Sequence, residues 1–214
     1  MKVFDVQQRG ESWYNLRKAI PTCSRFDSII TAARGEPSKA QESLIDHLLA
    51  EALLPPEQGV IKNVMTPEME EGMRLEGEAR CLFDLQYAKE PVHETGFILA
   101  DNGRWGGSPD GLVGEHSGVE IKCVSGPVQI KTLREGILPL QYRAQVSGYM
   151  VVTGRRSWSY FSYCRNLPAF HLTVDWDEFT DKLLTELHKF SEKYNEARLK
   201  FGLKPIGQDG PQTP

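Results

Sequence analysis

Two carboxylates and one amine are spaced so that two neighbouring strands can bring them to one divalent metal ion. Asp110 follows Pro109, and Glu120 and Lys122 come ten and twelve residues after Asp110. Residues 115–118 predict a hairpin turn, so the carboxylates can meet across the two strands while Glu120 and Lys122 share a face. Mg²⁺ takes one or two carboxylates and keeps water or phosphate oxygens as its other ligands. The pattern therefore indicates metal-assisted hydrolysis of a phosphodiester.

Lys122 has a predicted role beside these acids. An amine at this position can orient or deprotonate the attacking water, and partial burial is expected to lower its pKa for that purpose. The spacing alone is a loose pattern. The alternative interpretation is that Asp110 is a turn residue after Pro109 and that Glu120 and Lys122 are an exposed pair on a strand.

Glu76 is a candidate acid from a third element. A helix predicted over residues 67–88 carries an apolar stripe at helical spacing, through Met69, Met73, Ala79 and Phe83. Glu76 lies within this stripe, and a buried carboxylate is costly unless it is paired or metal-bound. We therefore expect Glu76 to be a ligand or to support the metal site, with an ordinary helical pair to Arg80 as the alternative.

The remaining elements predict how these residues are positioned. Helical spacing and capping residues predict further helices over residues 11–18, 24–33, 39–54, 139–152 and 177–201. Strands are expected at residues 97–101, 111–114, 119–124, 158–164 and 170–174. Helices flanking a small mixed sheet make the fold class α/β or α+β. A single domain, which would be the nuclease domain, is expected over residues 1–201, with a flexible tail over residues 202–214.

Composition restricts the class of protein further. The chain has 214 residues and a net charge of −4, which argues against a protein that coats nucleic acid non-specifically. Its four cysteines are scattered without ligand spacing, so structural zinc is not expected and the thiols are expected to be reduced. There is no apolar run of membrane-spanning length and no signal-peptide pattern, so we expect a cytoplasmic protein without a membrane partner.

Several blocks together resemble the lambda exonuclease group of YqaJ-like viral recombinases, which have the restriction-endonuclease-like PD-(D/E)xK fold. The matching blocks, in order, are RGESWYNLR at 9–17, PTCS at 21–24, GMRLE at 72–76 with AR at 79–80, SPDGL at 108–112, EIKC at 120–123, YRAQV at 142–146 and WSYF at 158–161. The resemblance covers roughly residues 9 to 175.

The resemblance implies roles for the metal-site residues. Asp110, Glu120 and the backbone carbonyl of Ile121 would bind Mg²⁺, with two ions per active site and Mn²⁺ as a substitute. Lys122 would position or activate the water. Glu76 would help to hold the nucleophile or the metal shell, and Gln145 would lie beside the reacting phosphate. Asp101 would be a peripheral acid; a turn-capping role is its alternative.

The resemblance also implies how DNA is held. Arg17 and Ser24 match the family's 5′-phosphate pocket, and Arg34 matches a further DNA-contacting arginine. Met69 matches an apolar side chain that helps to separate the strands. Judged from the residues alone, Arg17 would be a surface cation, Ser24 a helix N-cap and Met69 a core residue.

The activity that the resemblance implies is digestion of linear duplex DNA from its 5′ ends to mononucleotides. The remaining 3′ single strands would serve recombination with a single-strand annealing protein. A homotrimeric ring around the DNA is expected, and Arg155-Arg156 could serve an interface, a DNA face or solubility. The alternatives are a structure- or sequence-specific endonuclease of the same fold and a non-catalytic module that binds DNA ends.

Overall fold

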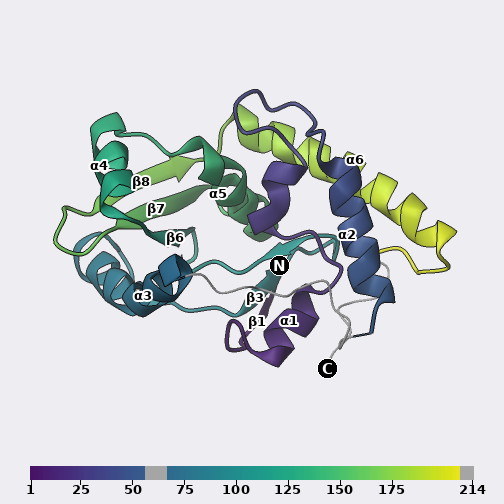
Figure 1. Cartoon of the computed structure of the whole chain (residues 1–214), viewed down its shortest axis with the longest axis horizontal. Coiled ribbons are helices and arrows are strands. Elements are labelled where there is room, and N and C mark those ends of the chain that lie inside the picture. Colours follow the sequence, from purple (N-terminus) through teal and green to yellow (C-terminus); the bar gives the residue numbers. More distant parts are fainter. Residues whose placement is uncertain (56–66, 208–214) are drawn as a thin grey trace.

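The larger sheet has five strands in the order β2-β5-β6-β7-β8 and lies in the left half of the view in Figure 1. The computed structural model describes residues 1–55 and 67–207, without the side chains of residues 67–69 and 71. β6 (Ser117–Cys123) and β7 (Ser157–Tyr163) are parallel, and every other neighbouring pair in this sheet is antiparallel. The other strands are β2 (Val92–His93), β5 (Gly111–Val113) and β8 (Phe170–Asp175). The sheet is mixed, as the sequence predicts.

Helices cover both faces of this sheet (Figure 1). α3 (Pro67–Gln86) packs on one face, where Leu75, Ala79 and Phe83 form a core cluster with side chains of β6 and β7. α5 (Leu140–Thr153) packs on the other face in the largest core cluster. α6 (Glu178–Lys200) contacts α5, α2 (Gln41–Leu53) contacts α6, and α4 (Gly126–Glu135) contacts β7 and β8.

The alternation of side chains along β6 divides the core from the candidate site. Val119 and Ile121 point into the cluster beneath α3. Because neighbouring residues of a strand face opposite sides, Glu120 and Lys122 point toward α5. There they contact Gln145 and Tyr142, which belong to that helix. The same strand therefore supplies a hydrophobic face to the fold and a charged face to the site.

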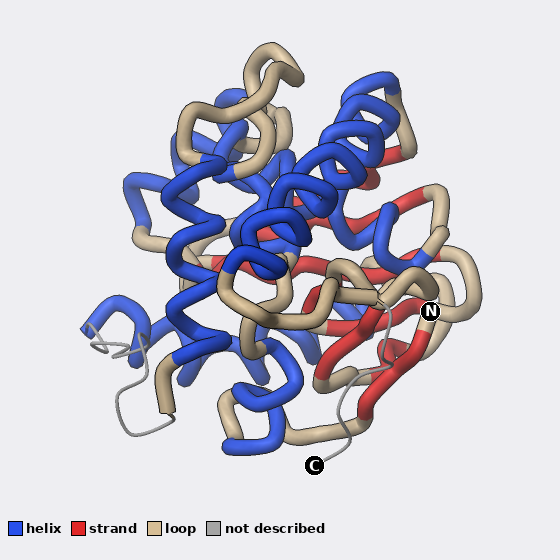
Figure 2. The backbone as a smooth tube through the Cα atoms, turned by 90° about the vertical axis from the view of Figure 1, so that its right-hand side faces the viewer, coloured by secondary structure: helices blue, strands red, loops and turns tan. Residues whose placement is uncertain are grey.

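A second, three-stranded sheet joins the amino-terminal segment to this core. Its strands β1 (Lys2–Phe4), β3 (Phe97–Leu99) and β4 (Gly106–Gly107) have the order β1-β3-β4, and the amino terminus lies beside the strands (Figure 2). α1 (Glu11–Arg17) contacts β3, and Thr22 forms a bridge with Gly106. This sheet therefore brings the end of α1 beside the residues that follow β4.

The short strands β1, β2 and β4 were not expected, and two helical segments also differ from the sequence-based expectations. The α-helix expected over residues 24–33 is a short 3₁₀ helix, η1 (Cys23–Ser28), because the chain turns at Thr31, whose side chain bonds both backbone groups of Glu36. α4 was not expected. Its buried residues are Gln129 and Thr132, while Val128 and Ile130 are exposed. The pattern on which helix prediction relies is therefore inverted in α4.

The two arginines after α5 have structural roles. Arg155 is largely buried and donates to the backbone carbonyls of Val113 and Ser117, at the two sides of the β5–β6 turn. Arg156 stacks on the ring of Trp176, 4.3 Å from its centroid. Arg155 therefore fastens the hairpin that carries Asp110 and Glu120.

The carboxyl-terminal segment returns to the core after α6. Leu203 and Ile206 pack against the main cluster, and the Ile206 amide donates to Asn195 at 2.8 Å. The rest of the expected tail, 208–214, lies outside the described residues. Within the described part of the chain, no helix combines the length and apolar composition needed to cross a bilayer.

Gly107 lies where β4, η1 and α5 meet, and we expect Gly107→Ala to lower stability. An added Cβ would lie 2.6 Å from Cys23 Sγ and 2.9 Å from a ring carbon of Tyr149. Overpacking of this kind costs about 1–3 kcal/mol. Gly77→Ala is the matched control, because nothing lies within 4 Å of its added Cβ and a helical alanine should gain about 0.5–1 kcal/mol. Denaturant unfolding measures both; equal effects would contradict the tight junction.

Candidate active site

The β5–β6 hairpin brings Asp110 beside Ile121. β5 begins at Gly111, which pairs with Val119, so Asp110 lies just beyond the end of the ladder. Its side-chain Oδ2 accepts a hydrogen bond from the Ile121 amide at 2.6 Å. The N–H and C=O groups of a strand residue point to the same side, so the Ile121 carbonyl also faces Asp110. The structure thus brings together the two oxygen groups predicted from the sequence.

Glu120 is almost fully buried, at 2 % exposure. Its Oε1 lies 2.5 Å from Lys122 Nζ and 2.6 Å from Gln145 Nε2. Its Oε2 is buried and has no hydrogen-bond partner among the described residues. One carboxylate oxygen is therefore held by two nitrogen donors, and the other remains available to a ligand.

The charges of this cluster perturb one another. Burial, and then the negative charge of Glu120, raise the pKa of Asp110 well above its usual value. Burial acts to lower the pKa of Lys122, but the charges of Glu120 and Asp110 outweigh it and raise that pKa. The expectation of a lowered lysine pKa was therefore wrong for this arrangement, because two carboxylates stabilise the ammonium.

The donor set fits a hard divalent cation. Asp110, Glu120 and the Ile121 carbonyl offer oxygen ligands. A cation bound there would give the second Glu120 oxygen a partner and would offset the repulsion between the two carboxylates. The described residues contain no group of three or more His, Cys, Asp or Glu side chains arranged around a metal position. Two carboxylates and a carbonyl are sufficient for Mg²⁺, which keeps water or phosphate oxygens as further ligands.

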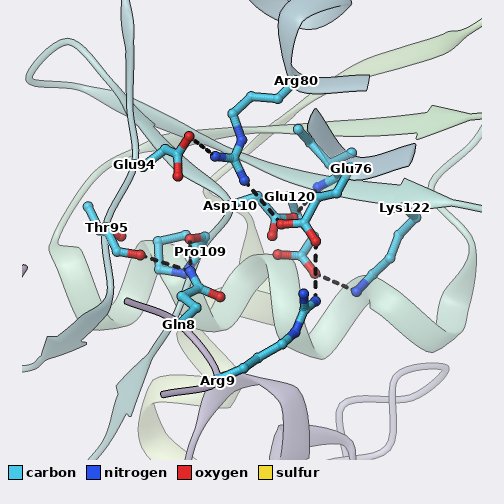
Figure 3. Close-up of polar contacts among 11 residues, drawn as sticks. Gln8, Arg9, Glu76, Arg80, Glu94, Thr95, Pro109, Asp110, Glu120 and Lys122 are labelled. Atoms are coloured by element: carbon cyan, nitrogen blue, oxygen red, sulfur yellow. Dashed lines mark hydrogen bonds and ion pairs between the residues drawn. The ribbon is translucent and has the colours of Figure 1, made fainter. Parts of the chain in front are cut away.

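Glu76 approaches this cluster from α3 (Figure 3). It is half-buried and paired with two arginines, at 3.0 Å from Arg80 and 3.2 Å from Arg9. Its charge contributes to the raised pKa of Asp110. The expected stripe was partly wrong, since Met73 is exposed and Leu75 is buried in its place, and this leaves Glu76 at the edge of the core face.

A chain of hydrogen bonds leads from Glu120 to Ser108, the residue that follows β4. Gln145 Nε2 lies 2.9 Å from the Tyr149 hydroxyl, and that hydroxyl donates to the Ser108 carbonyl at 3.2 Å. Tyr149 stacks on Trp158 at 5.1 Å between ring centroids. Tyr149 was not among the predicted site residues; its position one helical turn after Gln145 was the available signal.

Arg17 lies at the far end of this chain, in a pocket of hydroxyl groups. Its guanidinium donates to Ser108 Oγ at 3.0 Å and contacts Thr22 Oγ1 and Ser24 Oγ, each at 3.4 Å. It also stacks over Trp13 at 4.1 Å from the ring centroid. Burial lowers the pKa of Arg17. No carboxylate pairs with Arg17 in the described part of the chain, so its charge is suited to binding an anion.

Two sequence-predicted residues do not join these groups. Arg34 is exposed and lies 3.9 Å from Glu36. Asp101 is exposed and pairs with the amino-terminal amine, so it is separate from the buried acids. Met69 lies on α3, but its side chain falls outside the described residues.

Other residues around the site were missed as functional candidates. Gln8 donates to the carbonyls of Thr95 at 2.8 Å and Pro109 at 3.0 Å, which fixes the residue before Asp110 (Figure 3). Arg80 also pairs with Glu94. These contacts join residues that are far apart in the sequence, so no local spacing predicts them.

The chain is similar to known proteins in sequence and in fold. The family model described as the YqaJ-like viral recombinase domain matches residues 12–156. The crystal structure of LHK-Exo, an alkaline exonuclease from Laribacter hongkongensis, is similar with a TM-score of 0.72 and 26% identity, over 90% of this chain and 98% of that one. The complex of LHK-Exo with dAMP gives the same values.

A more distant structure shares the fold. A phage-related exonuclease from Haemophilus somnus 129PT matches with a TM-score of 0.62 and 14% identity, over 85% of this chain and 96% of that one. No curated protein matches the sequence. The matched segment contains the Arg17 pocket and the carboxylate cluster, and it spans most of the fold. The chain therefore belongs to the YqaJ-like viral recombinase family and has the mixed α/β fold of PD-(D/E)xK exonucleases.

Proposed function

We propose that this chain is a Mg²⁺-dependent exonuclease that digests linear duplex DNA from its 5′ ends and leaves 3′ single strands. Membership of an exonuclease-like recombinase family supports a nuclease role. The observation that carries the proposal is the connection between two sites. The Asp110–Glu120–Lys122 cluster is joined through Gln145, Tyr149 and Ser108 to the Arg17 pocket.

The residues of the cluster divide the proposed chemistry. A bound divalent ion would supply Lewis-acid activation of the phosphate and would lower the pKa of water. Asp110, Glu120 and the Ile121 carbonyl would hold it. The Lys122 ammonium would orient the attacking water and stabilise charge on the phosphate oxygens. Gln145 holds Glu120 in place and would lie beside the reacting phosphate.

The Arg17 pocket would determine which end of the DNA is used. A terminal 5′ phosphate can accept hydrogen bonds from the guanidinium, and the hydroxyl of Ser24 adds a neutral donor. Stacking on Trp13 holds the guanidinium plane in one orientation. The pocket and the cluster lie on the same chain of hydrogen bonds, so an end held at Arg17 would place a nearby phosphodiester at Lys122.

The wider biological setting of the proposal follows from the family resemblance. We propose that the enzyme acts in the cytoplasm beside a single-strand annealing protein and that three copies form a ring around the duplex. Arg34 is exposed and could contact DNA in such a ring. A ring would retain DNA despite the net charge of −4, because topology replaces broad electrostatic attraction. Mass measurement in solution tests the trimer.

Lys122→Ala should abolish hydrolysis and leave DNA binding intact, because the residue contacts Glu120 and belongs to no core cluster. Lys131→Ala is the matched control; Lys131 is an exposed cation that pairs with Glu135 on α4. Release of mononucleotides and gel-shift binding measure the two effects. Near-normal digestion by Lys122→Ala would remove its catalytic assignment.

The substrate form separates the proposal from its alternatives. Linear duplex DNA should be degraded progressively to mononucleotides, and covalently closed circles should remain intact. Cleavage of closed circles would instead support an endonuclease of the same fold. Tight binding to DNA ends without hydrolysis by the wild-type protein, with Mg²⁺ present, would support a non-catalytic module.

Arg17→Ala should reduce the preference for 5′-phosphoryl over 5′-hydroxyl ends by about tenfold or more, the magnitude of a charge-assisted hydrogen bond. The neighbouring Lys18 contacts the Leu54 carbonyl instead of the pocket, so Lys18→Ala is the control. Initial rates on paired substrates that differ only in the end group give the ratio. An unchanged ratio in Arg17→Ala would contradict the pocket assignment.

Mg²⁺ and Mn²⁺ should support activity, and Ca²⁺ should support it poorly because its coordination is larger and looser. Any of these ions that binds should raise the melting temperature, because it binds only the folded state. Asp110→Asn should remove this shift while stabilising the metal-free protein, since it removes a charge that burial and Glu120 disfavour. Asp101→Asn is the control. A full metal-induced shift in Asp110→Asn would contradict the ligand assignment.

A further inference from the structure

The Arg17 pocket is formed by a loop that returns onto its own beginning. Arg17 ends α1, and its guanidinium contacts the hydroxyls of Thr22 and Ser24, five and seven residues later. The turn of this loop is Ala19, which has a φ of +58°. A residue with a Cβ rarely adopts this left-handed conformation and does so at a cost. Something else in the fold must therefore hold Ala19.

Both backbone groups of Ala19 are bound by side chains from distant helices. Its N–H donates to Glu51 Oε2 at 2.9 Å, and its carbonyl accepts from the Tyr194 hydroxyl at 3.1 Å. Ala19 is buried, at 8 % exposure. Strained backbone of this kind persists where its surroundings over-determine it. Here α2 supplies the acceptor and α6 supplies the donor.

The same Glu51 carboxylate also reaches the other side of the loop. Its Oε1 lies 3.3 Å from Arg25 Nη1 and 2.9 Å from His47 Nε2. Arg25 directly follows Ser24, so its anchoring fixes the backbone that presents the Ser24 hydroxyl. Glu51 is itself 6 % exposed and is therefore shielded from solvent. One buried carboxylate thus binds both ends of the segment that surrounds the Arg17 guanidinium.

We propose that Glu51 is a positioning residue for the 5′-phosphate pocket, a role that rests on the proposed function. Glu51 would not touch DNA. It would hold the Ala19 turn and Arg25 so that Thr22 and Ser24 stay beside Arg17. Without it, the turn can relax out of the left-handed conformation, and the hydroxyls then leave the guanidinium. End recognition would weaken, while the carboxylate cluster on the β5–β6 hairpin would keep its geometry.

Glu51→Gln tests this role, because it keeps the side-chain size and removes the charge that Arg25 requires. We expect the KM ratio between 5′-hydroxyl and 5′-phosphoryl ends to fall by about tenfold, with kcat on saturating phosphorylated ends within about twofold of wild type. Glu186→Gln is the matched control. Glu186 is a similarly buried carboxylate on α6, at 5 % exposure, and it is bound by Gln41 of α2 and by Lys189. The Glu186→Gln protein should be less stable than wild type but should keep the preference for 5′-phosphoryl ends.

A rescue variant separates positioning from general destabilisation. Glycine adopts positive φ without a Cβ penalty, so adding Ala19→Gly to Glu51→Gln should recover part of the lost preference. Tyr194→Phe removes the hydroxyl that binds the Ala19 carbonyl. It should lower the ratio in the same direction by a smaller factor. These variants keep the inference testable if Glu51→Gln alone does not fold.

The outcomes distinguish this inference from the function on which it rests. Wild-type protein that ignores the end group, or an unchanged ratio in Arg17→Ala, contradicts the pocket itself and with it the role of Glu51. A wild-type preference that survives in Glu51→Gln contradicts only the positioning role. An equal loss in Glu186→Gln also overturns it, because the effect would then follow from stability alone. Anisotropy binding in the Lys122→Ala background gives the same ratio without turnover.

Discussion

Two carboxylates that repel each other in a buried place are the constraint around which the site is organised. Asp110 and Glu120 are close enough that the charge of one raises the pKa of the other. The fold offsets this repulsion locally, through the Lys122 ammonium, the Gln145 amide and the Ile121 N–H. Each partner comes from a rigid element, which keeps the oxygens converging. The second Glu120 oxygen has no partner among the described residues, which leaves it free to bind a cation.

The site and the core share strand β6 but use different residues of it. β6 presents Glu120 and Lys122 on one face while Val119 and Ile121 fill the cluster under α3 on the other. On α5, Tyr149 serves both, since its ring stacks on buried Trp158 while its hydroxyl links Gln145 to Ser108. A substitution of Tyr149 will therefore disturb packing and the hydrogen-bond chain together.

The sequence predicts the parts of this molecule that depend on local pattern. Alternation along residues 119–124 predicts β6, and two-residue spacing correctly places Glu120 and Lys122 on one face. The sequence does not predict α4, because its buried side is polar and is held by hydrogen bonds in place of apolar contacts. The pairing of Glu76 with Arg9 joins positions 67 residues apart. This ion pair depends on the tertiary structure, which local sequence patterns do not predict.

The polar inner face of α4 has a consequence for the strand that precedes it. Gln129 exchanges hydrogen bonds with the backbone and side chain of Ser162 and donates to the Pro168 carbonyl. Apolar contacts tolerate sliding and small rotations, whereas hydrogen bonds demand particular distances and angles. These hydrogen bonds therefore fix both the rotation of α4 about its axis and its position relative to β7 and β8. Because α4 begins three residues after β6 ends, this lock also anchors the carboxyl end of the strand that carries Lys122.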